Sequence, residues 1–196
     1  MPCTLIRLAG CPLRCSYCDT PQAIPTDSGN WLAVDAIIRQ VKETNRPLVL
    51  VTGGEPLAQR YCIELLKQLS GLDCIVQLET SGAYSIQAVP SDIHRIVDFK
   101  TPGSGEDQRN CMQNLELLTA GDEIKLVLTS RMDYEWARDF IRKNHLGSND
   151  IPVLLSPAWG EVAASDLCQW VLDDSLPVRV QIQMHKTIWG PEAEGV

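Results

Sequence analysis

The sequence lacks the features that would place a protein in a membrane, on a nucleic acid or outside the cell. No uninterrupted apolar stretch approaches the roughly 18 residues that a membrane helix needs. Arg7 interrupts the apolar run at the N-terminus, which therefore does not resemble a secretion signal. The chain has 17 Lys and Arg against 25 Asp and Glu, a balance unsuited to neutralising phosphates. We expect a cytoplasmic protein that binds neither membrane nor nucleic acid.

Repeats, low-complexity blocks and linkers are also missing, so we expect one domain over residues 1–196. The content of 44% apolar and 21% charged residues is typical of a globular protein. The eight cysteines are too few for a disulfide-dense scaffold. In a reducing compartment, such cysteines are more often metal-binding, catalytic or core residues.

Short apolar runs alternate with amphipathic helical patterns along the chain. The runs predict buried strands at Thr4–Leu8, Leu48–Val51, Ile75–Leu78, Ile96–Phe99, Ile124–Leu128, Val153–Leu155 and Val178–Met184. Apolar residues at helical spacing predict helices over 34–41, 57–69, 133–147 and 163–171, the third capped by Asp133. Continuous apolar strands joined by helices predict a parallel sheet covered by helices. This pattern predicts the α/β fold class.

Unusual side chains cluster directly after the predicted strands. In a parallel α/β sheet, ligands bind at the carboxyl ends of the strands. The segments that follow the strands here are 10–20, 52–56, 79–82, 100–105, 156–157 and 185–186. Since they carry most of the unusual cysteine, glycine and charged patterns, the sequence predicts a functional site at this edge.

Three cysteines, Cys11, Cys15 and Cys18, lie within eight residues on the loop after the first strand. Three thiolates so close together need a cation to neutralise their repulsion, so we expect a metal. Three ligands on a tight loop favour a 4Fe-4S cluster with one iron left open to substrate or cofactor. The alternatives are a structural zinc loop, for which His94 or another cysteine would supply the fourth ligand, and three unrelated core cysteines.

The Cys-x3-Cys-x2-Cys loop resembles the signature of the radical S-adenosylmethionine superfamily, and Gly53-Gly54-Glu55-Pro56 is similar to its second motif. Glycines let a backbone approach a ligand closely, and Glu55 can accept a hydrogen bond from a cationic amine. The resemblance implies the fold of that superfamily. Because this chain is shorter than radical enzymes with a full six-unit barrel, we expect an α/β fold that forms an open, abbreviated partial (β/α) barrel of mostly parallel strands. It also implies that Cys11, Cys15 and Cys18 hold the cluster and act in catalysis, with a 5′-deoxyadenosyl radical formed from S-adenosylmethionine.

The residues around these motifs narrow the resemblance. They are Arg7, Asp19, Thr20, Thr52 and the segments 79–82 and 183–186. Together they resemble the 7-carboxy-7-deazaguanine synthase family. This resemblance implies that the pterin 6-carboxy-5,6,7,8-tetrahydropterin is converted to 7-carboxy-7-deazaguanine with loss of ammonia, in queuosine and 7-deazapurine biosynthesis. It also implies a 4Fe-4S cluster, S-adenosylmethionine and Mg²⁺ as cofactors, a reductant protein such as flavodoxin, and a homodimer.

The resemblance assigns roles to further residues at matching positions. Those implied to contact S-adenosylmethionine are Tyr17, Cys18, Asp19, Gly54, Glu55, Ser81, Asp98, Phe99, Lys100 and Ser156. Thr20 would bind Mg²⁺, for which a hydroxyl is a suitable hard donor. Arg7 and Thr52 would bind the pterin, because a guanidinium pairs with a carboxylate through two hydrogen bonds. Without the resemblance, a salt bridge at the rim would explain Arg7, and a capped turn would explain Thr20 or Ser81.

The last predicted strand gives a separate hypothesis. Val178–Met184 alternates apolar and polar residues, and its polar face continues to His185. If this strand closes the open side of the barrel, Gln183 and His185 face the substrate. The alternative is an ordinary edge strand with a solvated face.

The sequence departs from the family pattern at two places. Asp98-Phe99-Lys100 stands where the family often has Ser-Pro-Lys, so the match there is limited to Lys100. Members usually begin further upstream, with a segment that holds the pterin, whereas this chain starts at Met1. We therefore expect either a shortened relative or a start that lies upstream.

Two functions of other classes remain open from the sequence. A glycyl-radical-enzyme activase shares the cysteine loop and the Gly-Gly-Glu-Pro turn. A protein without enzymatic activity, either an iron–sulfur electron carrier or a zinc-stabilised binding module, would share the cysteine loop. Residues Asp19-Thr20 and the 183–186 segment favour the pterin enzyme over both.

Overall fold

The computed structural model describes residues 1–147, 150–191 and 193. Its seven strands form one sheet in which every neighbouring pair is parallel and the spatial order follows the chain. The strands are β1 (Cys3–Leu8), β2 (Leu48–Gly53), β3 (Ile75–Thr80), β4 (His94–Asp98), β5 (Glu123–Leu128), β6 (Val153–Pro157) and β7 (Arg179–Val180). β1 and β7 are the two edges, so the sheet is open. The prediction of an open, parallel α/β partial barrel is confirmed.

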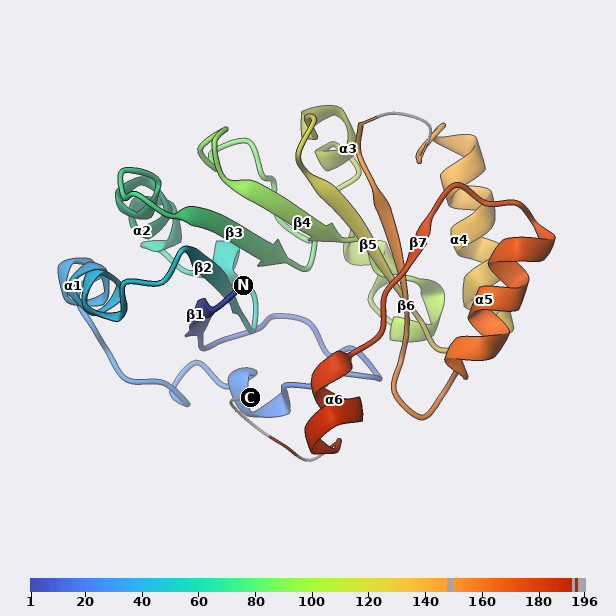
Figure 1. Ribbon diagram of the computed structural model, residues 1–196, viewed down its shortest axis with the longest axis horizontal. Helices are drawn as coiled ribbons and strands as arrows, with labels where there is room; N and C mark the ends of the chain where they lie inside the picture. The colour runs from blue at the N-terminus through green and yellow to red at the C-terminus, as the bar shows by residue number, and fades with distance from the viewer. Residues whose placement is uncertain (148–149, 192, 194–196) are drawn as a thin grey trace.

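The sheet curves, and its longer helices lie along the outer side (Figure 1). They are α1 (Val34–Thr44), α2 (Cys62–Ser70), α4 (Arg131–Lys143) and α5 (Ala164–Asp173). Shorter elements are the 3₁₀ turns η1 (Pro21–Ala23), η2 (Pro56–Ala58), η3 (Pro102–Ser104) and η4 (Asp107–Arg109), with α3 (Asn114–Leu117) and α6 (Met184–Trp189). In the described part of the chain, no helix has the length and apolar character needed to cross a membrane.

The two faces of the sheet differ in polarity. In β5, Ile124, Leu126 and Leu128 are fully buried against the helices, whereas the alternate residues Lys125 and Val127 are partly exposed on the inner face. β1 and β3 show the same alternation. The expectation of continuously apolar, buried strands is therefore wrong for these strands. Helices cover the outer face, and the inner face stays open because the barrel does not close.

The chain is shortened in its crossovers rather than in its number of strands. Residues 81–93, between β3 and β4, form turns and bends without a helix. Between β4 and β5, the connection consists of η3, η4 and the four-residue α3. The fold is therefore abbreviated in these two connections, which contain no long helix.

Two predicted helix starts are wrong. Ser130, not Asp133, caps α4, because the Ser130 hydroxyl accepts a hydrogen bond from the Asp133 amide. The predicted helix over 57–69 is divided into η2 and α2, since Gln59 adopts an extended backbone. The Gln59 side chain there donates to the Ala9 carbonyl, which joins this break to the loop after β1.

The last predicted strand is also wrong in its extent. β7 has two residues, and the Gln181 amide adds one further bond, to the Leu155 carbonyl. In a parallel ladder, the next donor on β6 would be residue 157, which is Pro157 and has no N–H. The chain then turns into α6, so residues Met184–Trp189 are helical.

A buried ion pair joins β4 to the start of β5 on the outer side. Arg95 and Asp122 are 5% and 2% exposed, and the Arg95 Nε lies 2.9 Å from Asp122 Oδ1. Asp122 also accepts from the Arg95 amide and from the amide and hydroxyl of Thr119. Burial by itself would raise the pKa of Asp122, but the hydrogen bonds from Arg95 and Thr119 outweigh it and lower the pKa.

We predict that Asp122→Asn lowers the free energy of unfolding at neutral pH by about 3 kcal/mol, because it leaves the buried Arg95 charge without its partner. Since the folded-state pKa of Asp122 is depressed, its contribution is present above the unfolded value and is lost as pH falls through the folded value. The difference between wild type and variant should therefore shrink in acid. Denaturant unfolding at several pH values measures it.

Glu135→Gln is the matched control, because it removes an exposed carboxylate paired with Arg131 in α4. It should cost less than about 1 kcal/mol. Equal effects of the two substitutions would contradict the assignment of the Arg95–Asp122 pair as a structural centre.

Candidate active site

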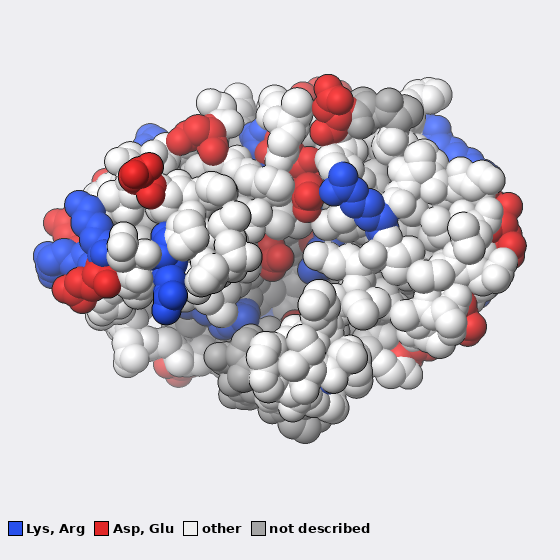
Figure 2. All heavy atoms as spheres, in the orientation of Figure 1, with Lys and Arg blue, Asp and Glu red and all other residues white. Residues whose placement is uncertain are grey.

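The inner face of the sheet and the loops at its carboxyl edge bring together most of the predicted site residues. Register places Arg7 of β1 beside Thr52 of β2, and Asp98 of β4 beside Lys125 of β5. Because side chains at paired positions point to the same face, these four lie on the inner face. Figure 2 shows a hollow near the middle of the displayed face, with both acidic and basic side chains visible around it.

The cysteine loop leaves β1 at this edge. All three thiols are free; Cys11 and Cys15 are partly buried and Cys18 is exposed. Burial raises the pKa of Cys15, the Lys100 ammonium opposes this effect, and Asp98, Cys11 and Cys18 raise the pKa further. The thiols are therefore close enough to affect one another electrostatically.

This donor set fits an iron–sulfur cluster with an open iron. Three soft thiolates from one loop are available, and their mutual repulsion favours binding to a cation. Among the described residues, no group of three or more His, Cys, Asp or Glu side chains already has metal-binding geometry. The fit therefore rests on the types of donor and their proximity, not on a preformed coordination shell.

The glycines of the Gly-Gly-Glu-Pro turn are required by the packing of this loop. A Cβ at Gly53 would overlap the backbone of Leu8, and a Cβ at Gly54 would overlap the carbonyls of Gly10 and Ala23. The Gly54 amide donates to the Leu8 carbonyl at 2.8 Å. The end of β2 therefore lies directly against the start of the cysteine loop, and any side chain at these two positions would separate them.

Glu55 has a different local environment from the one its motif suggests. Its side chain is 0% exposed. One carboxylate oxygen accepts from the Leu57 amide at 2.9 Å and the Thr80 hydroxyl at 2.8 Å, and the other accepts from the Ser81 amide at 2.6 Å. The carboxylate thus joins the end of β2 to the end of β3. A ligand amine that bound Glu55 would share the carboxylate with three internal hydrogen-bond donors.

A buried ammonium lies beside the cysteine loop. Lys100 Nζ contacts Asp98 Oδ2 at 2.8 Å and lies 5.7 Å from the centre of the Tyr17 ring. Burial tends to lower the pKa of Lys100, but Asp98, Tyr17 and Cys15 together outweigh burial and raise the pKa, so the group stays charged. The other Asp98 oxygen and the Tyr17 hydroxyl are buried without a hydrogen-bond partner in the described residues. Burial raises the pKa of Tyr17, which keeps its hydroxyl protonated.

A chain of polar contacts joins residues far apart in the sequence at this edge. Arg7 donates to the Thr20 hydroxyl at 3.4 Å, and Thr20 donates to Asp19 Oδ1 at 3.1 Å. The other Asp19 oxygen accepts from Gln183, the residue that precedes α6, at 2.6 Å. Figure 1 shows α6 lying close to the loop after β1. β1, the cysteine loop and α6 thus meet at the three residues predicted to serve the substrate, Mg²⁺ and S-adenosylmethionine.

Three other predicted site residues lie in three different environments: the core, the inner face of the sheet and α6. Phe99 is fully buried in the core between sheet and helices, where its ring lies 5.6 Å from that of Phe140, so its side chain does not face the site. Ser156 is buried on the inner face, at the register position of Val127. His185 is partly buried on α6 rather than on a strand, so the geometry behind its predicted role is wrong.

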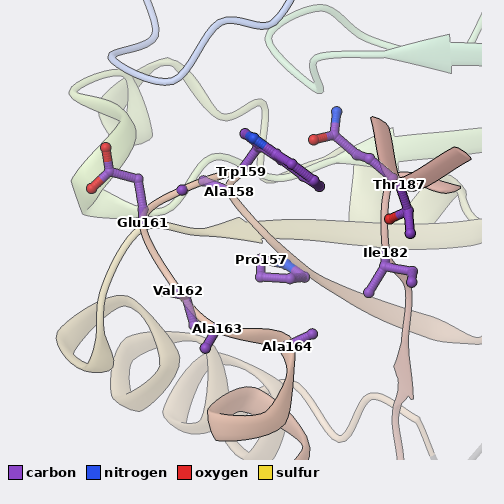
Figure 3. Close-up of a pocket in the computed structure, with 11 residues that line it drawn as sticks. Pro157, Ala158, Trp159, Glu161, Val162, Ala163, Ala164, Ile182 and Thr187 are labelled. Carbon is purple, nitrogen blue, oxygen red and sulfur yellow. The ribbon is translucent and has the colours of Figure 1, made fainter. Parts of the chain in front are cut away.

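A cavity of about 470 Å³ lies where the loop after β6 meets α6. In Figure 3, Trp159, Pro157, Ile182 and Thr187 surround its central space, and the Glu161 carboxylate points away from it. The space is therefore largely apolar and has one flat aromatic wall. Gln183, which also lines it, connects it to Asp19 in the cysteine loop.

Sequence reasoning missed residues that hold the site without belonging to a motif. The Asn110 side chain makes two hydrogen bonds with the backbone of Lys100. Its Nδ2 donates to the Lys100 carbonyl at 2.9 Å, and its Oδ1 accepts from the Lys100 amide at 2.8 Å. Buried Asn114 likewise fixes residues 82–86 after β3. A lone asparagine in a loop gives no sequence signal of such a role, because its partners are determined by the fold.

Comparison with known proteins agrees with this geometry. The model of the Radical SAM superfamily matches residues 5–101. A 7-carboxy-7-deazaguanine synthase from Chlorobaculum tepidum is 39% identical over 198 residues, covering 100% of this chain and 89% of that protein. One from Koribacter versatilis is 39% identical over 210 residues, covering 100% and 92%. This chain belongs to the 7-carboxy-7-deazaguanine synthase family.

Solved structures show the same fold as this member of the 7-carboxy-7-deazaguanine synthase family. Streptococcus suis SuiB bound to S-adenosylmethionine superposes with a TM-score of 0.61 at 15% identity, over 92% of this chain and 50% of that one. SuiB bound to its precursor peptide SuiA gives 0.62 at 13% identity, over 92% and 48%. The chain thus spans about half the length of these structures. The comparisons give no support to the activase or electron-carrier alternatives.

We predict that Gly54→Ala lowers the free energy of unfolding by about 1–3 kcal/mol, because the new methyl group must displace the backbone at Gly10 and Ala23. Gly71→Ala is the control, since its Cβ would be 3.6 Å from the nearest atom, an ordinary contact. Denaturant titration of both variants tests this. Similar stability of the two variants would show that the close packing at Gly54 is unimportant.

Proposed function

We propose that this protein converts 6-carboxy-5,6,7,8-tetrahydropterin to 7-carboxy-7-deazaguanine with loss of ammonia, in queuosine and 7-deazapurine biosynthesis. The observation that supports this most is the packing of the three-cysteine loop against the Gly-Gly-Glu-Pro turn, in a chain that matches synthases of that name along its whole length. An electron carrier or a zinc module has no need for the second element beside the first.

The cysteine loop and its neighbours provide the first half of the chemistry. Cys11, Cys15 and Cys18 would hold a 4Fe-4S cluster, and such a cluster would supply one-electron reduction of S-adenosylmethionine. The buried Lys100 ammonium offsets part of the thiolate charge. Glu55 acts through position, because its carboxylate fixes the ends of β2 and β3 on either side of the cofactor.

The remaining S-adenosylmethionine contacts come from the same edge. Tyr17, Asp19 and the backbone of residue 54 lie around the loop, with Ser81 and Asp98 following on the next strands. Ser156 directly precedes Pro157, which lines the apolar cavity. The flat Trp159 ring that forms one wall of this cavity suits an adenine ring. Phe99 contributes by its backbone, since its ring lies in the core.

The substrate lies nearer to β1 and β2. Arg7 pairs with the pterin carboxylate, and Thr52, beside it in the register, contacts the ring. Thr20 would supply a hydroxyl ligand to Mg²⁺, with the substrate carboxylate and water as the other oxygen donors. Its position between Arg7 and Asp19 supports this role. His185 on α6 would contact the pterin from the other side.

We further propose that residues 1–196 work as one unit in the cytoplasm, where the eight cysteines that are free in this structure stay reduced. A flavodoxin-type protein supplies the electron, and the protein acts as a homodimer. The electron donor and the homodimer rest on the family resemblance.

The decisive experiment incubates the reduced, cluster-loaded protein anaerobically with the carboxytetrahydropterin, Mg²⁺ and S-adenosylmethionine. We expect 7-carboxy-7-deazaguanine by mass spectrometry and 5′-deoxyadenosine only as a transient species. Cys15→Ala should abolish cleavage, because two thiols cannot hold the cluster in register, whereas Cys168→Ala, an exposed thiol on α5, should leave it intact. A wild-type protein that loads iron and sulfide but cleaves no cofactor would refute the proposal.

We predict that Thr20→Ala raises the Mg²⁺ concentration needed for half-maximal turnover by at least about tenfold, because a metal ligand is removed. Thr20→Ser keeps the hydroxyl and should restore most of the dependence. Steady-state rates across a magnesium titration measure this effect. An unchanged titration curve for Thr20→Ala would place the metal elsewhere.

A further inference from the structure

The cysteine loop has few hydrogen bonds of its own in the stretch that carries its middle ligand. Within it, the Cys18 amide donates to the Cys15 carbonyl at 3.2 Å, and the Arg14 guanidinium folds back onto the Cys11 and Leu13 carbonyls. Short backbone-bonded turns of this kind leave several conformations open. The position of Cys15 must therefore be determined by contacts outside the loop.

Those contacts come from one segment, the docking turn, which we define as residues 101–106 after β4. The Ser16 amide donates to the Ser104 carbonyl at 3.1 Å, and the Ser16 hydroxyl donates to the Gly103 carbonyl at 2.7 Å. The Arg14 amide donates to the Glu106 carboxylate. Arg14 and Ser16 are the two neighbours of Cys15, so the backbone is held on both sides of the middle thiol.

The docking turn is itself fixed by a buried carboxylate on α4. Asp133 is 2% exposed, and it accepts from the Gly103 amide at 2.8 Å and from the Thr129 amide and hydroxyl at 2.9 and 2.7 Å. A Cβ at Gly103 would overlap both Thr129 and Asp133. Because the Asp133 carboxylate is buried, the loss of any one of its three donors would leave part of its negative charge without a hydrogen bond, which costs free energy. These hydrogen bonds therefore hold Gly103 firmly in place.

We propose that Asp133, the docking turn and Ser16 form a positioning device that holds Cys15 in place for the cluster. Asp133 fixes Gly103, and Gly103 and Ser104 fix Ser16 beside the thiol. Asp133 and the docking turn lie outside the cysteine and glycine motifs, and Ser16 is one of the two residues between Cys15 and Cys18. The inference rests on the proposed function, because it concerns the cluster that the three cysteines would hold. Asp133 and Ser16 are positioning residues, acting on the cluster through Cys15.

The test compares Ser16→Ala and Asp133→Asn with two controls. Ser28→Ala removes a hydroxyl that also donates to a carbonyl, at 2.9 Å, but outside the cysteine loop. Asp139→Asn changes an exposed carboxylate on the same helix as Asp133. The first readout is the rate at which the reconstituted cluster loses iron to a chelator. We expect it to rise about two- to tenfold in Ser16→Ala and Asp133→Asn, as befits the loss of one hydrogen bond, and to stay at the wild-type value in the controls.

The second readout needs no cluster. In the metal-free protein, the rate of alkylation of Cys15 by iodoacetamide, followed by peptide mass spectrometry, should rise in Ser16→Ala, with buried Cys62 as the internal reference. Ser16→Thr keeps the hydroxyl and should return both rates towards wild type. If circular dichroism shows that Asp133→Asn does not fold, Ser16→Ala alone tests the proposal. Ser16 is exposed, so its substitution should not disturb folding.

The two possible failures can be told apart. If wild type loads a four-iron cluster and both rates in Ser16→Ala match those in Ser28→Ala, the positioning device is overturned and the proposed function stands. If wild type forms no such cluster under anaerobic reconstitution, both proposals fall.

Discussion

The parallel direction of all seven strands is the constraint on which the site depends. It brings the carboxyl ends of the strands to one edge, so that segments up to 164 residues apart in the chain make contact there. The buried carboxylates of Glu55 and Asp133 then join neighbouring segments at this edge. Each accepts several internal hydrogen bonds, which compensates the cost of burying its charge. The edge is thus built from polar contacts, whereas the sheet is held to its helices by apolar packing.

The open inner face is what allows this packing and the chemistry to coexist. Apolar residues of alternate positions, such as Leu126 and Leu128, fill the space between sheet and helices. The other positions, such as Lys125, carry polar side chains into the concave side. The residues on the inner face of each strand can therefore be chosen to suit a ligand, while the residues on the outer face maintain the hydrophobic core. The crossovers without long helices, after β3 and β4, leave the middle of the edge to loops, and the docking turn is one of them.

The strands and the place of the site could be predicted from the sequence, because apolar runs and motifs are local signals. The first six predicted strands match the observed ones within two residues at either end. What failed depended on distant partners. Asp133 looks like a helix cap, but its carboxylate bonds to Gly103, thirty residues away. The last strand stops because of Pro157 on its neighbour. The burial of Phe99 follows from strand register, which a tripeptide does not reveal.

The hydrogen bond between Gln183 and Asp19 has a consequence for how the protein is made. Synthesis proceeds from the N-terminus, so β1 and the cysteine loop leave the ribosome well before α6, which lies more than 160 residues later in the chain than Asp19. A nascent chain therefore exposes its three thiols long before the helix that lies beside them exists. During that interval the thiols are more accessible to oxidants than in the folded protein, and the contacts around the loop are complete only once residue 183 has been synthesised.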